Sequence, residues 1–145
     1  MPIAFHPRAG QILLCDFSTG FKEPEMVKSK RPVIVLANSM RGRVNLVTVV
    51  ALSTTTPDPV MRYHLELPRS CLPQLGRFQD ATTWVKGDML YTVGFHRLDP
   101  IRLGKRHPTT GKRLYFQNAL SRETMRDVYA CVLHGLNLGH LAPGL

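Results

Sequence analysis

The sequence predicts a mainly β domain, in which a small, strongly bent barrel is closed by one C-terminal helix. Short runs of β-branched and other apolar residues alternate with turn residues through most of the chain, as expected for short strands. Apolar residues recur at helical spacing only near the C-terminus. The length of 145 residues suits one modest core, so we expect residues 1–145 to form a single domain.

Five strands are expected in the first part of the chain, at residues 10–17, 33–37, 44–52, 63–67 and 82–93. Pro32 suits the start of the second strand, because proline lacks the N–H that a strand interior needs. Gly87 and Asp88 predict a turn or a bulge within the last strand. Residues 68–80 contain two prolines and a glycine, and we expect them to form a connecting loop.

The expected helix spans about residues 121–138, with Ser121 as its N-cap. Its apolar face is formed by Val128, Cys131, Val132 and Leu136. Before it lies a basic stretch, about residues 99–116, whose structure the pattern does not determine.

The charge of the chain indicates a polyanionic partner. Nineteen Lys and Arg against ten Asp and Glu give a net charge of +9. Residues 101–121 contain cations and no carboxylate; the cations are Arg102, Lys105, Arg106, Lys112 and Arg113. Nucleic acid is the commonest partner of such a surface. An acidic protein, or solvent alone, is the alternative for this stretch.

Other classes are disfavoured by composition. No apolar run is long enough for a transmembrane helix, and the first ten residues lack the apolar core of a secretory signal, so we expect a cytoplasmic protein. Cys15, Cys71 and Cys131 lie far apart, which predicts reduced thiols and no zinc site. We therefore expect neither a metal nor a cofactor.

Two positions are candidates for phosphate chemistry. Arg31 opens the second strand, and its planar guanidinium can donate two parallel hydrogen bonds to a phosphate. Ser53, Thr54 and two further threonines follow the third strand, where a hydroxyl can be held in place to donate to a phosphate oxygen. Taken separately, a surface arginine and a polar loop are the better explanations of these residues.

The order of three blocks adds to this interpretation. The first contains Gly10, Ile12, Asp16 and Phe17; the second is residues 31–36 (RPVIVL) followed by 49–54 (VVALST); the third is residues 84–93 followed by Arg97 and Leu98. Together they resemble the PemK/MazF family of toxin endoribonucleases. The resemblance covers about residues 8–98 and the terminal helix, and leaves 68–80 and 99–116 as insertions. Met89 departs from the pattern, where a glutamine is usual.

The resemblance implies a site. The family's paired arginine and hydroxyl match Arg31 and Ser53, with Thr54 as the alternative hydroxyl. The basic residue and aspartate that are catalytic in some members match Lys86 and Asp88.

The remaining roles follow from position. Asp88 or Glu25, in the loop before Arg31, would act as the general base. Flanking phosphates would be held by Lys28, Lys30, Lys86 and Arg97.

The resemblance also implies an SH3-like barrel of the plasmid-maintenance toxin type, and a homodimer inhibited by a cognate antitoxin. The implied activity is metal-independent cleavage of single-stranded RNA to a 2′,3′-cyclic phosphate and a 5′-hydroxyl, which stops translation and growth. Two alternatives remain: a non-enzymatic toxin of the same fold that binds a protein such as gyrase, and a barrel that only binds RNA.

Overall fold

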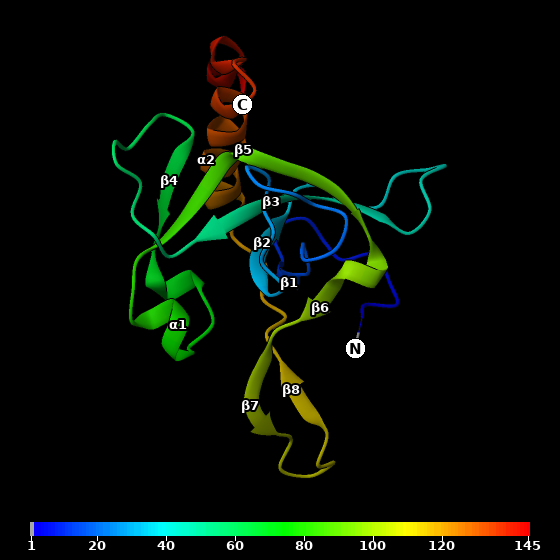
Figure 1. Cartoon of the computed structure of the whole chain (residues 1–145). Coiled ribbons are helices and arrows are strands. Elements are labelled where there is room, and N and C mark those ends of the chain that lie inside the picture. Colours follow the sequence, from blue (N-terminus) through cyan, green and yellow to red (C-terminus); the bar gives the residue numbers. More distant parts are fainter. Residues whose placement is uncertain (1) are drawn as a thin grey trace.

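The computed structural model describes residues 2–145 and is built around one antiparallel sheet (Figure 1). Its strands are β1 (Ile12–Cys15), β2 (Arg31–Val35), β3 (Leu46–Ser53), β4 (His64–Leu67), β5 (Thr83–Gly94) and β6 (Leu98–Pro100). They lie in the order β4-β5-β3-β2-β1-β6, so β4 and β6 are free edges and the sheet does not close. The mainly β class with a C-terminal helix is confirmed, although the expected barrel is an open, bent sheet.

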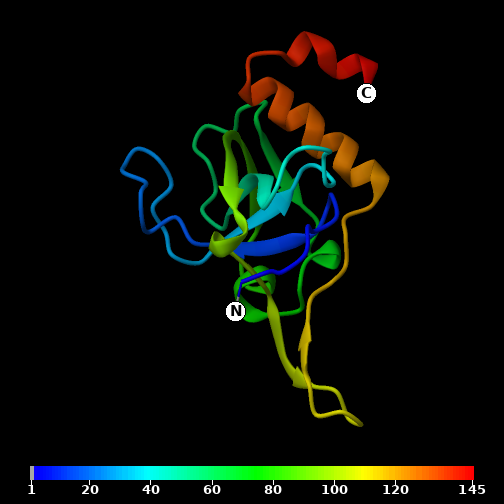
Figure 2. The same cartoon turned by 90° about the vertical axis from the view of Figure 1, so that its right-hand side faces the viewer.

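Helix α2 (Arg122–Gly135) packs on one face of this sheet (Figure 2). Ser121 caps it as predicted, because its side-chain oxygen accepts a hydrogen bond from the Thr124 N–H at 3.1 Å. The helix ends at Gly135, and a 3₁₀ helix (Gly139–Gly144) follows.

The sheet is apolar on both faces, because alternate residues of each central strand enter different clusters. Ile34, Val50 and Val85 face the helix with Val128, whereas Val33 and its neighbours on the other face pack around Phe17. Burying one such side chain fully contributes about 1.5–3 kcal/mol. Buried runs on both faces explain why β2 and β3 read as nearly continuous apolar sequence.

A bulge in β5 allows the helix to approach closely. Val50 pairs with Leu90, but the next residue, Ala51, pairs with Lys86, so three residues of β5 have no partner on β3. A Cβ on Gly87, within the bulge, would collide with the backbone carbonyl of Cys131 in α2. A Cβ on Gly135 would in turn collide with the carbonyl of Gly87. The predicted turn or bulge at Gly87 is therefore a bulge, and glycine is required there by the contact.

Two segments that were expected to be a loop or were left undetermined contain regular structure. Residues 68–80, expected to be a connecting loop, hold a 3₁₀ helix (Arg69–Cys71) and the single-turn helix α1 (Gly76–Gln79), which is anchored by the fully buried ring of Phe78. The basic stretch forms a hairpin of β7 (Arg102–Arg106) and β8 (Arg113–Tyr115) that projects away from the sheet (Figure 1, Figure 2). The segment 95–97 is a further 3₁₀ turn between β5 and β6.

Over residues 2–145, no helix has the length and apolar character needed to cross a membrane.

Replacing Gly87 with Ala should lower the free energy of unfolding by about 1–3 kcal/mol, because the added methyl overpacks the contact with α2. Urea unfolding followed by circular dichroism measures this. Gly144→Ala is the matched control, because no heavy atom lies within 4 Å of its added Cβ. Equal stability of the two variants would show that the helix can move away at no cost.

Candidate functional site

One row of side chains crosses the sheet where β2 begins and β3 ends. Cys15 pairs with Arg31, and Ser53 pairs with Trp84. Strands β2 and β3 pair from Val35–Val49 to Val33–Ala51, and this register, extended by two residues, puts Arg31 opposite Ser53. Because directly paired residues project from the same face, these side chains are neighbours on one surface. The two residues implied by the sequence for phosphate chemistry are therefore brought together.

The guanidinium of Arg31 has spare hydrogen-bonding capacity. Its Nη1 donates to the Leu52 carbonyl oxygen at 3.4 Å, while its Nε is buried without a partner among the described residues. Burial, and then the charge of Arg77, lower the pKa of Arg31 from its usual value. A half-buried cation with an unused donor and a second cation nearby is an arrangement that an anion would stabilise.

The hydroxyl of Ser53 is held in place. Ser53 is buried, and its Oγ accepts a hydrogen bond from the Thr55 N–H at 3.1 Å. This bond uses an oxygen lone pair and leaves the hydroxyl proton available to a ligand. Thr54, Thr55 and Thr56 are exposed. Ser53 is thus the hydroxyl of this run that is both fixed and next to Arg31.

Lys86 lies in the adjacent row, between Ala51 and His64. Asp88 is exposed in the bulge, close enough for its charge to act on His64. Burial lowers the pKa of His64, and Asp88 opposes this shift. The Nδ1 of His64 accepts from the Met61 N–H at 3.0 Å, which assigns the proton of the neutral ring to Nε2. His64 can therefore donate a hydrogen bond toward this surface, but it has no free lone pair with which to act as a base.

The thiol of Cys15 does not contribute nucleophilic chemistry. Burial raises the pKa of Cys15 to about 12, although Arg97 lowers it in part. The thiol beside Arg31 therefore stays protonated at neutral pH.

Four further predicted residues lie outside the two rows. Glu25 and Lys28 are exposed on the loop between β1 and β2, and no contact joins either to Arg31 or Ser53. The guanidinium of Arg97 lies 4.8 Å from the centre of the Phe21 ring, and its Nη1 donates to the Asp16 carbonyl at 2.9 Å. Arg97 thus clamps the base of this loop. Lys30 is exposed directly before Arg31.

Sequence reasoning missed two residues of the site. Arg77 lies on α1, where its Nη2 donates to the Lys30 carbonyl at 3.2 Å, and nothing in the loop-like sequence of residues 68–80 indicates this position. Trp84 faces Ser53 and has a buried, unpartnered indole N–H. The sequence does contain a signal for Trp84. Side chains two residues apart on a strand project from the same face, so a site that includes Lys86 is expected to have Trp84 beside it.

Among the residues that the structure describes, no group of three or more His, Cys, Asp or Glu side chains is placed to hold a metal ion.

Comparison with known proteins identifies the family of the chain. Residues 8–135 match the sequence model of the PemK-like, MazF-like toxins of type II toxin–antitoxin systems. The chain belongs to this family. Its relatives include YifN of Escherichia coli strain K12, which is 29% identical, with 94% of this chain and 96% of YifN covered.

Solved structures share the fold of this PemK/MazF-like toxin. MazF from Deinococcus radiodurans superposes with a TM-score of 0.60 at 12% identity, covering 92% of this chain and 99% of that one. A mycobacterial endoribonuclease, solved in complex with its cognate antitoxin, gives 0.55 at 20% identity, covering 91% and 96%. The predicted family is confirmed, and the chain is a toxin of a type II system.

Replacing Ser53 with Ala should relieve growth inhibition by the toxin more strongly than Thr55→Ala or Thr56→Ala, with Thr54→Ala intermediate. Ser53 alone among these hydroxyls is buried and oriented beside Arg31. Growth curves after induced expression, normalised to the amount of folded protein, measure the effect. Similar small effects at all four positions would mean that the run is an ordinary polar loop.

Proposed function

We propose that this PemK/MazF-like toxin is an endoribonuclease that cleaves single-stranded RNA and thereby stops translation and growth. The observation that carries the proposal is the pairing of a half-buried guanidinium, with an unused donor, and an oriented hydroxyl. A surface that only binds protein has no need of such a pair, whereas a pentacoordinate phosphorus carries extra negative charge that both groups can stabilise.

The reaction uses the substrate's own 2′-hydroxyl as nucleophile, so it does not require a metal-activated water. A base removes the 2′ proton, the oxygen attacks the adjacent phosphorus, and the protonated 5′-oxygen leaves. The products are a 2′,3′-cyclic phosphate and a 5′-hydroxyl end. Arg31 stabilises the phosphorane and assists the leaving oxygen, while Ser53, with Thr54 beside it, anchors a non-bridging oxygen.

Two carboxylates are candidates for the base. Asp88 lies next to the row of Lys86 and His64, on the strand that also carries Trp84. Glu25 lies on the loop between β1 and β2, so it reaches the site only if that loop closes over RNA. The geometry therefore favours Asp88. Lys30 and Lys86 hold the flanking phosphates.

The partners follow from the same family. The mycobacterial relative was solved with its cognate antitoxin, and we infer a cognate antitoxin for this toxin as well, binding across its basic surface. We also infer a homodimer. Apolar side chains on the loop between β2 and β3 and at the start of β3 support a protein contact there; Val44 is 76% exposed, and Met40 and Leu46 are also exposed. Messenger RNA as substrate places the action in the cytoplasm.

Replacing Arg31 with Ala should lower the rate of RNA cleavage by about 10²–10³, because a transition-state contact is lost. Arg31→Lys should recover only part of the rate, since a lysine lacks the two-donor fork. The assay is incubation of single-stranded RNA with EDTA present and analysis of the ends for cyclic phosphate.

Arg126→Ala is the matched control, because Arg126 is exposed on α2. Full cleavage by Arg31→Ala would remove Arg31 from the mechanism. Intact RNA with the wild-type toxin would instead favour a protein-directed toxin or a simple RNA-binding module.

Asp88→Asn should lower kcat for RNA cleavage by about 10²–10⁴, and Glu25→Gln should leave it nearly unchanged. A positioned general base typically contributes that factor, whereas a carboxylate away from the reacting atoms contributes little. A fall in kcat with Glu25→Gln alone would assign the base to the loop.

A further inference from the structure

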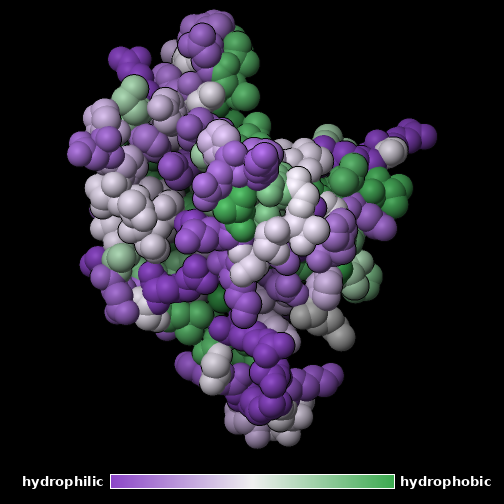
Figure 3. All heavy atoms as spheres, viewed as in Figure 1, coloured by the Kyte–Doolittle hydropathy of each residue, from purple (hydrophilic) through white to green (hydrophobic). Residues whose placement is uncertain are grey.

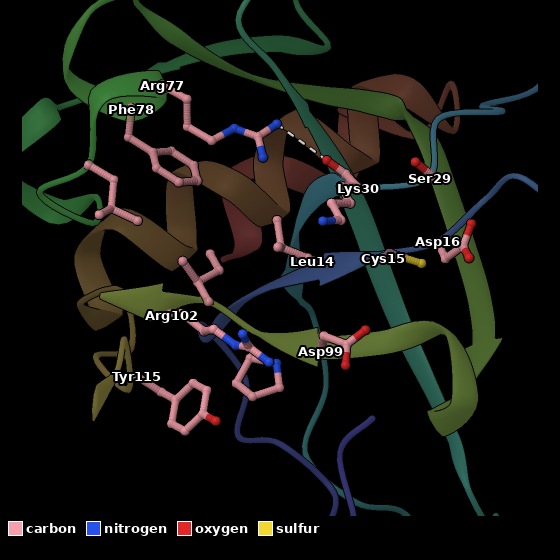
Figure 4. A pocket seen from close by; sticks show the side chains of 13 residues that line it. Leu14, Cys15, Asp16, Ser29, Lys30, Arg77, Phe78, Asp99, Arg102 and Tyr115 are labelled. Carbon is pink, nitrogen blue, oxygen red and sulfur yellow. Dashed lines mark hydrogen bonds between the residues drawn. The ribbon is translucent and has the colours of Figure 1, made fainter. Parts of the chain in front are cut away.

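A cavity of about 530 Å³ opens between the end of β1, helix α1 and the base of the β7–β8 hairpin. Leu14 forms part of its wall, and Phe78, Arg77, Arg102 and Tyr115 surround it (Figure 4). Its volume falls within the roughly 300–1,000 Å³ that is usual for ligand pockets. Both α1 and the hairpin belong to the segments that had no counterpart in the motif blocks of the sequence.

Three cations line this cavity: Lys30, Arg77 and Arg102. Arg102 pairs with Tyr115 across the hairpin, so a guanidinium and an aromatic ring share one face at its base. Figure 3 shows hydrophilic residues gathered over this hairpin.

Two carboxylates, Asp16 and Asp99, also line the cavity, toward the end of β1 (Figure 4). Asp16 is engaged by the N–H and the hydroxyl of Ser18. A lining with cations on one side, carboxylates on the other and aromatic rings suits a nucleotide. The cations can bind its phosphate, a ring can support its base, and a carboxylate can accept from a base amino group.

The cavity adjoins the row of Arg31 and Ser53. Cys15 belongs to both, because it lines the cavity and pairs with Arg31. Arg77 connects them further, since it donates to the carbonyl of Lys30 and its charge lowers the pKa of Arg31. A strand bound at Arg31 can therefore continue toward the cavity.

We propose that this cavity is a nucleotide subsite that holds one nucleotide of the RNA strand beside the scissile phosphate. Arg77 and Arg102 bind its phosphate, and Tyr115 supports its base. The proposal rests on the endoribonuclease activity and adds a contact that selects for strands long enough to reach the hairpin.

The test uses Arg102→Gln and Tyr115→Leu, made separately, with Arg126→Gln as the matched control. Once a cleaved sequence is found, the substrate is shortened one nucleotide at a time from each end. For the wild type and the control, KM should rise by about tenfold when the nucleotide that fills the cavity is removed, since one stacked base contributes about that much. For the two variants, KM should already be high and should not change at that step, while kcat stays nearly constant.

Binding is measured in parallel with RNA that lacks the 2′-hydroxyl at the cleavage position, so that chemistry does not enter. Arg102→Gln should weaken binding and reduce the salt slope by about 0.7, the value for one phosphate contact on a single strand. Thermal melting confirms that each variant is folded.

The outcomes separate the two proposals. If the wild type cleaves no RNA, the endoribonuclease proposal fails. If it cleaves RNA but both variants respond to shortening as the wild type does, only the subsite is wrong. Unchanged RNA binding together with weaker antitoxin binding would overturn the subsite and assign the cavity to the antitoxin.

Discussion

The close contact between helix α2 and the bulge in β5 is the constraint on which the rest of the structure depends. Gly87 and Gly135 bring the two backbones together, and α2 then covers the apolar face of the sheet. The same bulge shifts the register of β5 against β3 by three residues. Without the shift, Ser53 would face Gly87; with it, Ser53 faces Trp84, and Lys86 enters the neighbouring row. One local distortion therefore allows the helix to cover the core and also determines which residues of β5 lie beside Ser53.

The candidate site places buried polar groups, whose burial is energetically unfavourable, on strands that are held rigidly. Arg77 lies close to Arg31, and the repulsion between the two cations, together with burial, lowers the pKa of Arg31. Unpaired buried donors, such as the Nε of Arg31, cost about 1–3 kcal/mol each. These donors lie on strands that pack against apolar side chains on both faces, and this packing offsets the energetic cost. Strain of this kind is expected where a site is prepared for an anion before the anion arrives.

Local patterns predicted the central strands, the Ser121 cap and the bulge, because each depends on residues close together in sequence. The pairing of Arg31 with Ser53 came from the family motifs, since the register between β2 and β3 is not readable from either strand alone. Helix α1 depends on one buried ring, Phe78, inside a segment rich in proline and glycine. The hairpin was missed because its strands are mostly exposed and polar, so they show no alternation of apolar residues. The position of Arg77 could not be predicted because α1, which carries it, was not predicted. The open edges of the sheet could not be predicted either, because the strand order depends on pairing between distant parts of the chain.

The division between strands and insertions has a consequence for how such a toxin can change over evolutionary time. Arg31 and Ser53 lie on neighbouring strands in the middle of the sheet, whereas α1 and the hairpin lie at its margin (Figure 1). Lengthening or shortening either marginal segment leaves the spacing of Arg31 and Ser53 unchanged. Descendants of one ancestor can therefore diverge in what they recognise while they keep this pair of residues.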